Sequence, residues 1–173
     1  GSGRRVIHSM SESWSRKNQQ HLVAYIEQVK DMLRSQPGEV QRNPAPLWDD
    51  EQPSALQSLC QTFGLSAFER MTLLLCAAQD LDSEVQRLCA QVNGNPNAAY
   101  PTFSIALSVF PDPHWSALLP TSPLRLFRLV TPIELQQVSL TMCQLKIEER
   151  VLHYLTGLSY LDRSLHGIVE QVR

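Results

Sequence analysis

The chain has 173 residues, 43% of them hydrophobic, which is enough to bury a core as one domain or as one domain with an appendage. Its formal net charge of -2 and the scatter of its basic residues argue against a general attraction to nucleic acid or anionic lipid. No stretch approaches the ~18 apolar residues that span a bilayer, and no secretory leader is recognisable, so we expect a cytoplasmic protein.

Two N-terminal segments precede the arm and the domain. Residues 1–10 begin with Gly-Ser-Gly, which is typical of a cloning remnant, and we leave them out of the functional interpretation. Residues 11–35 predict one long amphipathic helix, because apolar side chains recur at steps of three and four. The stripe consists of Leu22, Ile26, Val29 and Leu33, flanked by Tyr25 and Met32.

Residues 36–53 are predicted to be a proline-rich linker or extended arm, since four prolines exclude a continuous helix or a central strand. Trp48 is the only large aromatic side chain of the arm, and with Leu47 it would anchor an extended segment in an apolar groove of a partner. Trp14 and Tyr25 would act similarly on the helix. Two alternatives stay open: the helix and the arm fold back on their own domain, or they bind a partner or a second copy.

The compact domain is expected over residues 54–173, around a helix that is apolar on every face. The stretch Met71–Ala78 (MTLLLCAA) carries no charge, so other elements must surround it. Ser66 and Glu69 precede this stretch and have the S-x-x-E spacing that begins a helix. The sequence therefore predicts that this helix is the buried centre of the fold.

The periodicity changes from helical to alternating in the last third of the chain. Segments 126–130 and 138–147 are rich in β-branched and alternating residues and predict a two-stranded hairpin. A closing helix follows and stops at Gly157, and Ser159 begins a last helix. This order predicts a mainly α fold with a small β-hairpin, an elaborated winged-helix-like domain preceded by the long helix and the proline-rich arm.

The sequence predicts no catalytic, cofactor-binding or metal-binding residues. No phosphate-binding loop of the form GxxxxGK[ST] occurs, so this chain should not hydrolyse ATP. The cysteines lack the close spacing of zinc ligands, and three of them fall on apolar helix faces, as expected of buried thiols in a reducing cytoplasm: Cys60, Cys76 and Cys89. A hydrolase built on Cys143 and His153 is a remote alternative, because such pairs meet in space rather than in sequence.

A winged-helix module that binds nucleic acid is the main alternative function, and it rests on fold analogy. Such a module needs polar and basic side chains on its recognition helix and around it. The two helices predicted before the hairpin, TFSIALSVF and PHWSALLP, contain no Arg or Lys. Residues 121–150 contain four basic and three acidic residues, which gives this segment a net charge of +1. These counts favour a protein partner.

Several ordered segments of the chain resemble one known family. They are FGLS-FER, a YPTF stretch, HWSALLP followed by PLR, and ERVLHYL-G--YLD. Together they cover roughly residues 53–165 and are similar to the N-terminal variant winged-helix region of large bacterial AAA-type ATPases. Those ATPases are often encoded with phage-tail-like contractile injection systems.

The resemblance implies a non-catalytic N-terminal interaction domain that recruits a client or adaptor or supports oligomerisation, for cargo handling or particle assembly in an injection system. In that family the catalytic cassette lies C-terminal to this region, so ATP and Mg are expected only there. We therefore expect no cofactor in this chain. The expected partner is a protein client, an adaptor or a second copy, and neither nucleic acid nor a membrane.

Overall fold

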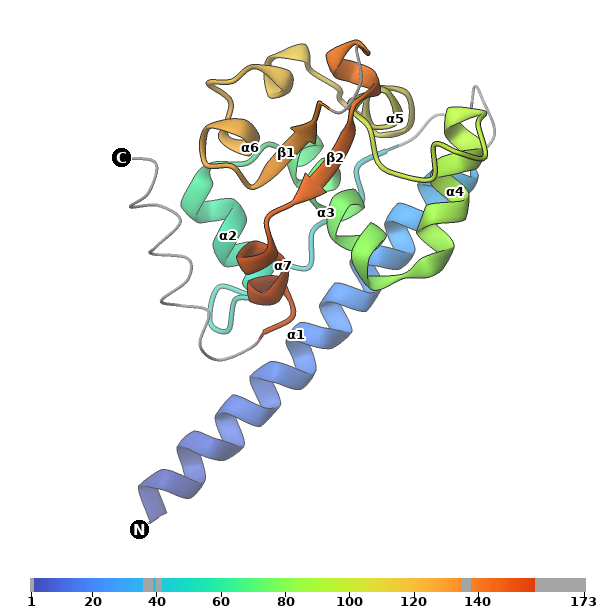
Figure 1. Cartoon of the computed structure of the whole chain (residues 1–173). Coiled ribbons are helices and arrows are strands. Elements are labelled where there is room, and N and C mark those ends of the chain that lie inside the picture. Colours follow the sequence, from blue (N-terminus) through green and yellow to red (C-terminus); the bar gives the residue numbers. More distant parts are fainter. Residues whose placement is uncertain (1, 36–38, 40–41, 135–137, 158–173) are drawn as a thin grey trace.

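The computed structural model describes residues 2–35, 39, 42–134 and 138–157, with side chains from Glu12 onward. It is mainly helical with one two-stranded antiparallel sheet (Figure 1), as predicted. In chain order the elements are α1 (Ser2–Arg34), α2 (Ala55–Phe63), α3 (Ala67–Leu81), α4 (Ser83–Asn93), α5 (Phe103–Val109), η1 (Trp115–Leu118), α6 (Pro123–Leu126), β1 (Val130–Ile133), η2 (Leu140–Met142), β2 (Gln144–Ile147) and α7 (Glu149–Leu155).

Helix α3 is the centre of the fold, as its apolar sequence predicts. Every residue from Met71 to Ala78 is at most 1% exposed, and α1, α4, α5 and β2 pack around the helix. The helix begins at a capping box, in which the Ser66 hydroxyl accepts the Glu69 N–H and the Glu69 carboxylate accepts the Ser66 N–H. The prediction of a buried central helix with this N-terminal cap is therefore confirmed.

Helix α1 folds back onto the domain to which it is joined. Its predicted apolar stripe is buried and packs on α3 and α4. Beside this contact the Lys30 ammonium pairs with the carboxylates of Asp82 (2.9 Å) and Glu84 (3.0 Å) at the start of α4. Within one chain, the structure therefore shows the intramolecular alternative for the helix.

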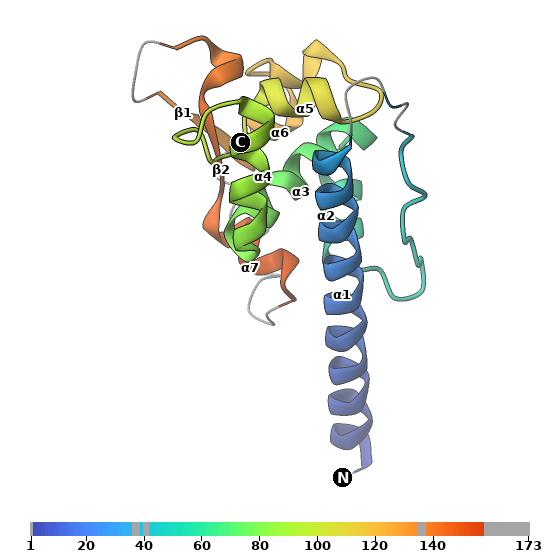
Figure 2. The same cartoon turned by 90° about the vertical axis from the view of Figure 1, so that its right-hand side faces the viewer.

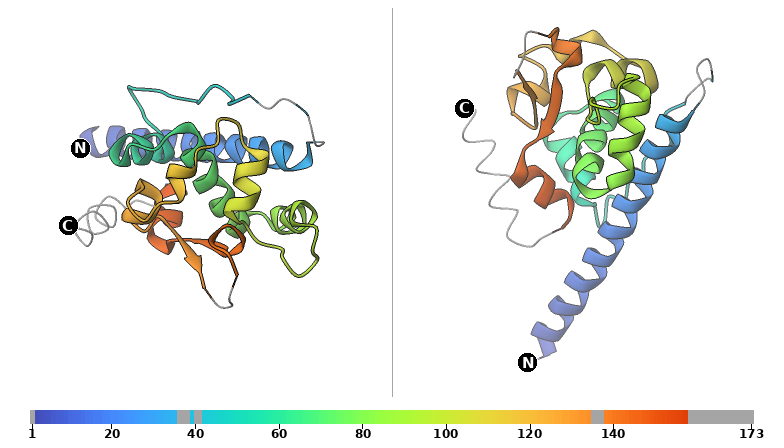
Figure 3. Two further views of the ribbon diagram at one scale, coloured as in Figure 1. Left: turned by 90° about the horizontal axis from the view of Figure 1, so that it is seen from above. Right: turned by 45° about the vertical axis from the view of Figure 1, so that its right-hand side comes forward.

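The helix starts earlier than the predicted residue 11. It begins at Ser2, because no proline or glycine interrupts the sequence between Gly3 and the end of the helix. Its N-terminal part extends beyond the body of the domain (Figure 3). Among the described helices, α1 included, none combines the length and hydrophobicity that a membrane crossing requires.

The buried amide of Asn18 joins α1 to two other helices. Its Nδ2 donates to the carbonyl of Leu155 at the end of α7 (3.1 Å), and its Oδ1 accepts the N–H of Ala55 at the start of α2 (2.8 Å). Gly157 passes so close that a Cβ there would lie 2.9 Å from Nδ2 of Asn18. Its φ of +84° also favours glycine. The last helix predicted from Ser159 lies outside the described residues.

The described part of the arm, residues 42–53, is extended and runs beside α1 (Figure 2). Side chains of the helices hold it through its backbone. The Leu47 N–H donates to the hydroxyl of Tyr25 on α1, and the Asp49 N–H donates to Oε1 of Gln57 on α2. Each donor–acceptor distance is 2.8 Å. The arm thus lies across its own domain.

The hairpin is present, but both strands are shorter than predicted. Strand β1 covers 130–133 rather than 126–130, because residues 123–126 form α6 and Arg128 then takes a left-handed φ of +54°. Strand β2 covers 144–147 rather than 138–147, because residues 140–142 form the 3-10 turn η2. Alternating apolar residues do not distinguish a strand from a tight turn of the same length.

The register of the hairpin places a proline in the middle of β1. Pro132 pairs with Leu145 of β2, and the N–H of Leu145 donates to the carbonyl of Pro101 on the side away from β1 (2.9 Å). Residues Leu145 and Ile147 of β2 are buried, so one face of the sheet packs on the helical core. The other residues of β2 lie nearer to solvent.

Candidate protein-docking groove

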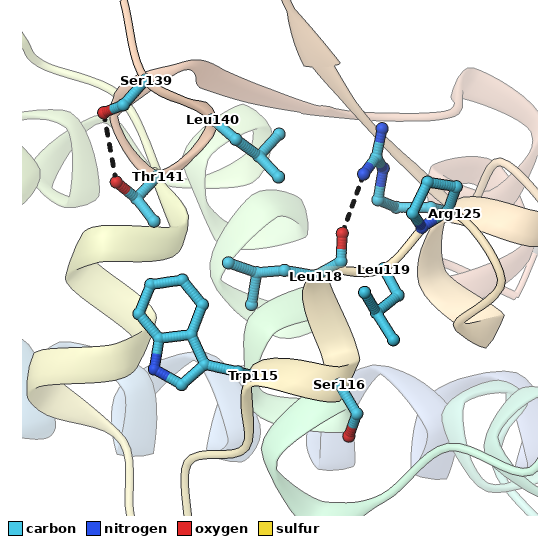
Figure 4. Close-up of a pocket in the computed structure, with 9 residues that line it drawn as sticks. Trp115, Ser116, Leu118, Leu119, Arg125, Ser139, Leu140 and Thr141 are labelled. Atoms are coloured by element: carbon cyan, nitrogen blue, oxygen red, sulfur yellow. Dashed lines mark hydrogen bonds between the residues drawn. The ribbon is translucent and has the colours of Figure 1, made fainter.

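An apolar groove of about 650 Å³ opens between the turns η1 and η2 (Figure 4). Trp115 and Leu118 lie on one side of it and Leu140 on the other, while Arg125 lies at one end. Residues 115–125 meet residues 139–141 here, from the other side of β1 in the sequence. The groove is lined by Trp115, Ser116, Leu118, Leu119, Pro120, Arg125, Ser139, Leu140 and Thr141.

The apolar side chains of this region are unusually exposed. Trp115 is 66% exposed and Leu119 is 51% exposed, although each could bury a large apolar area. Of the eight large apolar side chains that are exposed in the described residues, five lie on or next to η1, α6 and η2. These five are Trp115, Leu119, Leu126, Val138 and Met142. Trp115 and Leu119 line the groove itself, and exposed apolar side chains at a groove are typical of surfaces that bind another protein.

His114 fixes the start of η1. One ring nitrogen, Nε2, lies 2.7 Å from the hydroxyl of Ser66 at the N-terminus of α3, and Nδ1 lies 2.7 Å from the hydroxyl of Ser116. The ring also packs edge-on against Phe68, with the centroids 5.3 Å apart. Because both nitrogens and one edge are engaged, η1 is held in one place relative to the central helix.

The end of η1 is held by two side chains from α6 and its N-cap. The hydroxyl of Ser122 donates to the carbonyl of Ala117 (2.7 Å), and Nη1 of Arg125 donates to the carbonyl of Leu118 (2.8 Å). A short turn leaves its last carbonyls without partners of its own, so these bonds stabilise it. Trp115 and Leu119 are therefore presented to solvent by a turn that is braced at both ends.

The arrangement suits binding rather than chemistry. The walls are mainly apolar, the hydroxyls of Ser139 and Thr141 face each other at 3.3 Å, and Arg125 is the only charged side chain that lines the groove within the described residues. An apolar side chain of a partner would displace water from these walls, and an exposed tryptophan is a common anchor in such contacts.

Most basic residues near the hairpin are engaged within the domain. Lys146 lies 3.2 Å from the carboxylate of Asp80, and Arg150 lies 3.1 Å from that of Glu148. Arg125 donates to a backbone carbonyl as described above. Phosphates would have to compete with these contacts, so three of the four basic residues between 121 and 150 are poorly placed for a nucleic-acid surface.

The thiols do not form a nucleophilic centre in the described residues. Burial raises the pKa of Cys60 and of Cys89 to about 12 and also raises that of Cys76. Cys143 is also buried, and its Sγ donates to a backbone carbonyl near η2. His153 lies on α7, beyond the other end of β2. The described contacts give no support to the remote alternative of a Cys143–His153 pair, because β2 lies between the two residues and each has another neighbour, Ser139 for Cys143 and Glu149 for His153.

The four residues predicted to bind a partner lie on the α1 and arm side and contact their own chain. Tyr25 is buried in the core, and its hydroxyl accepts the N–H of Leu47. The indole N–H of Trp14 donates to the carbonyl of Pro53 (2.9 Å). Trp48 is the exposed member, at 38%. The structure assigns Tyr25 to the core rather than to a surface, and a partner role for Trp14, Leu47 and Trp48 stays a prediction.

Sequence reasoning missed the groove because it read PHWSALLP as an ordinary helix. The segment forms only the four-residue turn η1, so it cannot bury Trp115 and Leu119 against the core at the same time as Leu118. The signal was present in the sequence. A tryptophan and two consecutive leucines between prolines are too many large apolar side chains for one turn with one buried face.

The comparisons with known proteins agree with this fold. A family model described as the winged helix domain, variant, matches residues 11–169. No curated protein and no solved structure is detectably similar to the chain. The match begins within α1 and extends past α7, so it includes most of the long helix, the arm and the hairpin. The chain belongs to the variant family of winged helix domains.

Proposed function

We propose that this domain is a non-catalytic interaction module, and that the groove between η1 and η2 receives a protein client or adaptor. The observation that carries the proposal is the exposure of Trp115 and Leu119 on a turn that hydrogen bonds hold at both ends. A rigid turn loses little conformational entropy when a partner covers it. Most of the free energy gained by burying Trp115 and Leu119 would therefore contribute to binding.

We also propose that the module is the N-terminal part of a bacterial, cytoplasmic AAA-type ATPase that serves a contractile injection system. The support is the resemblance of several ordered segments, one of which, HWSALLP, builds η1. ATP and Mg would then bind only in a cassette of the parent protein C-terminal to this domain. The client would be a cargo or a particle component on which that motor acts.

The test begins with a photo-crosslinking amino acid at position 139 of the protein in its native host, because Ser139 lines the groove and is exposed and its replacement leaves Trp115 in place. The same label at position 23 is the control, because Val23 is exposed on α1 and does not line the groove. A protein that is captured only from position 139 is then purified and titrated against the domain. We expect Trp115→Ser to weaken this binding at least about tenfold and Val23→Ser to change it less than about twofold.

Salt dependence separates this function from nucleic-acid binding. Binding through an apolar groove should vary little with salt, whereas binding through phosphates weakens steeply as salt rises. A labelled DNA duplex that binds in a salt-dependent manner and is released by Arg128→Gln would contradict the proposal. So would a client whose affinity is the same for the Trp115→Ser variant and the unaltered domain.

A further inference from the structure

Arg70, in the first turn of α3, is only 8% exposed. Within the described residues, no carboxylate forms an ion pair with its guanidinium and no acceptor receives a hydrogen bond from it. The acidic side chains next to Arg70 or Trp48 in the sequence have other partners. Glu69 accepts the Ser66 N–H, Asp49 pairs with the Lys17 ammonium, and Asp50 accepts a hydrogen bond from the Gln57 amide. None of its nitrogens is among the fully buried atoms without a partner, so the guanidinium still reaches water. A mostly buried cation that lacks a counter-ion and remains accessible suits an external anion.

Trp48 covers the guanidinium from the arm. The Cζ of Arg70 lies 5.6 Å from the centroid of the indole ring, a cation–π contact that partly replaces the missing counter-ion. The ring itself is partly exposed, and it belongs to an extended segment rather than to the packed helices. A ligand could therefore reach Arg70 by displacing one surface side chain, without opening the core.

Tyr25 supplies a second donor in the same region. Burial raises the pKa of its hydroxyl, while the Leu47 N–H and the positive charge of Arg70 act in the opposite direction, so the group stays protonated at neutral pH. The oxygen accepts the Leu47 N–H, and no acceptor within the described part of the chain takes its own proton. A hydroxyl and a guanidinium together can hold an oxyanion.

We propose that Arg70 and Tyr25 form a carboxylate-binding site that Trp48 covers in the unliganded domain. A carboxylate fits better than phosphate for two reasons. Its single negative charge matches one buried cation, and the acidic run Asp49-Asp50-Glu51 beside Trp48 would repel a dianion. The planar carboxylate also matches the guanidinium fork. The site shares no residue with the lining of the groove, and the proposal does not depend on the client proposed for the groove.

The probes for this site are two short peptides and two salts. Acetyl-Ala-Glu-Ala-amide carries one carboxylate, and acetyl-Ala-Gln-Ala-amide is its neutral control. Sodium acetate represents a free organic acid and sodium phosphate a dianion, with ionic strength kept constant by sodium chloride. The readout is the indole N–H resonance of each tryptophan in the full, isotope-labelled chain. Trp14 and Trp115 serve as internal controls, because the Trp14 indole N–H donates to the Pro53 carbonyl and Trp115 lines the groove.

We expect the Glu peptide to shift the Trp48 resonance saturably, and the Gln peptide to leave it unchanged. Arg70→Met, which keeps a long apolar stem, should abolish the shift while the Trp14 and Trp115 resonances stay in place. Trp48→Ala should tighten binding about two- to fivefold, followed at the Arg70 Nε–H resonance, because the competing ring is gone. A shift with acetate but not with the peptide would assign the site to a free organic acid.

Three results would overturn the proposal. The first is the absence of a saturable shift with both carboxylate probes. The second is a shift that persists in Arg70→Met, since the guanidinium would then not be the binding group. The third is tighter binding of phosphate than of acetate, which contradicts the charge argument.

Discussion

Replacing Asn18 by alanine should destabilise the domain far more than its single amide suggests. The substitution leaves the N–H of Ala55 and the carbonyl of Leu155 buried without their partner. Each unsatisfied group costs about 1–3 kcal/mol, and alanine recovers up to ~0.7 kcal/mol through its helix propensity. We therefore expect the free energy of unfolding to fall by ~1.3–5.3 kcal/mol.

Urea denaturation followed by circular dichroism measures this change. Gln20→Ala is the matched control, because Gln20 lies on the same helix, is exposed and makes neither of the two Asn18 hydrogen bonds. Its effect should stay within about 0.5 kcal/mol. A loss below about 1 kcal/mol for Asn18→Ala would refute the reasoning. It would mean that α1 is not tied to α2 and α7 in solution, as expected if the helix packs on another copy instead.

Three further outcomes follow from the core, the ion pairs and the thiols. Leu74→Ala should cost ~2–5 kcal/mol in urea denaturation, because Leu74 is 0% exposed at the centre of α3; a small loss would contradict its burial. Hydrogen bonds from Arg34 and then Lys30 lower the pKa of Glu84 from 4.5 to about 2. Its stabilising contribution is thus complete above about pH 4.5 and is lost as the pH falls toward about 2. The melting temperature of Glu84→Gln should therefore depend less on pH between these two values than that of the unaltered protein. Burial of Cys60 and Cys89 predicts slow reaction with a thiol reagent in the native protein and fast reaction in urea; equal rates would count against it.

The parts of the fold that depend on local patterns could be predicted from the sequence. The apolar stretch Met71–Ala78, the capping box at Ser66 and the stripe of α1 each determine a helix and its buried face through neighbouring residues. The strand ends could not be predicted, because β1 starts only where α6 and the left-handed Arg128 allow the chain to turn. That limit is set by tertiary contacts.

The excess of apolar side chains in PHWSALLP could be seen in the sequence, but the groove that they help to line could not be predicted, for the same reason. It exists because His114 connects η1 to the start of α3 over a long sequence separation, and because Leu140 is brought opposite Trp115 by the hairpin. No periodicity records such contacts. Tyr25 is the converse case: it was predicted to bind a partner, yet its position beside the apolar stripe is a local pattern that favours burial, and the side chain is buried.

The proline in β1 has a consequence for how the hairpin meets other chains. In an antiparallel pair, facing residues direct their backbone groups either both toward each other or both away. The N–H of Leu145 points away from β1 toward Pro101, so the backbone of Pro132 points to the open edge, where it offers no N–H. An incoming strand would lack a donor at the middle of β1, while on the other edge the Leu145 N–H is already used. The hairpin therefore resists strand addition and edge-to-edge aggregation on both sides, and neighbours are left to engage the domain through side chains.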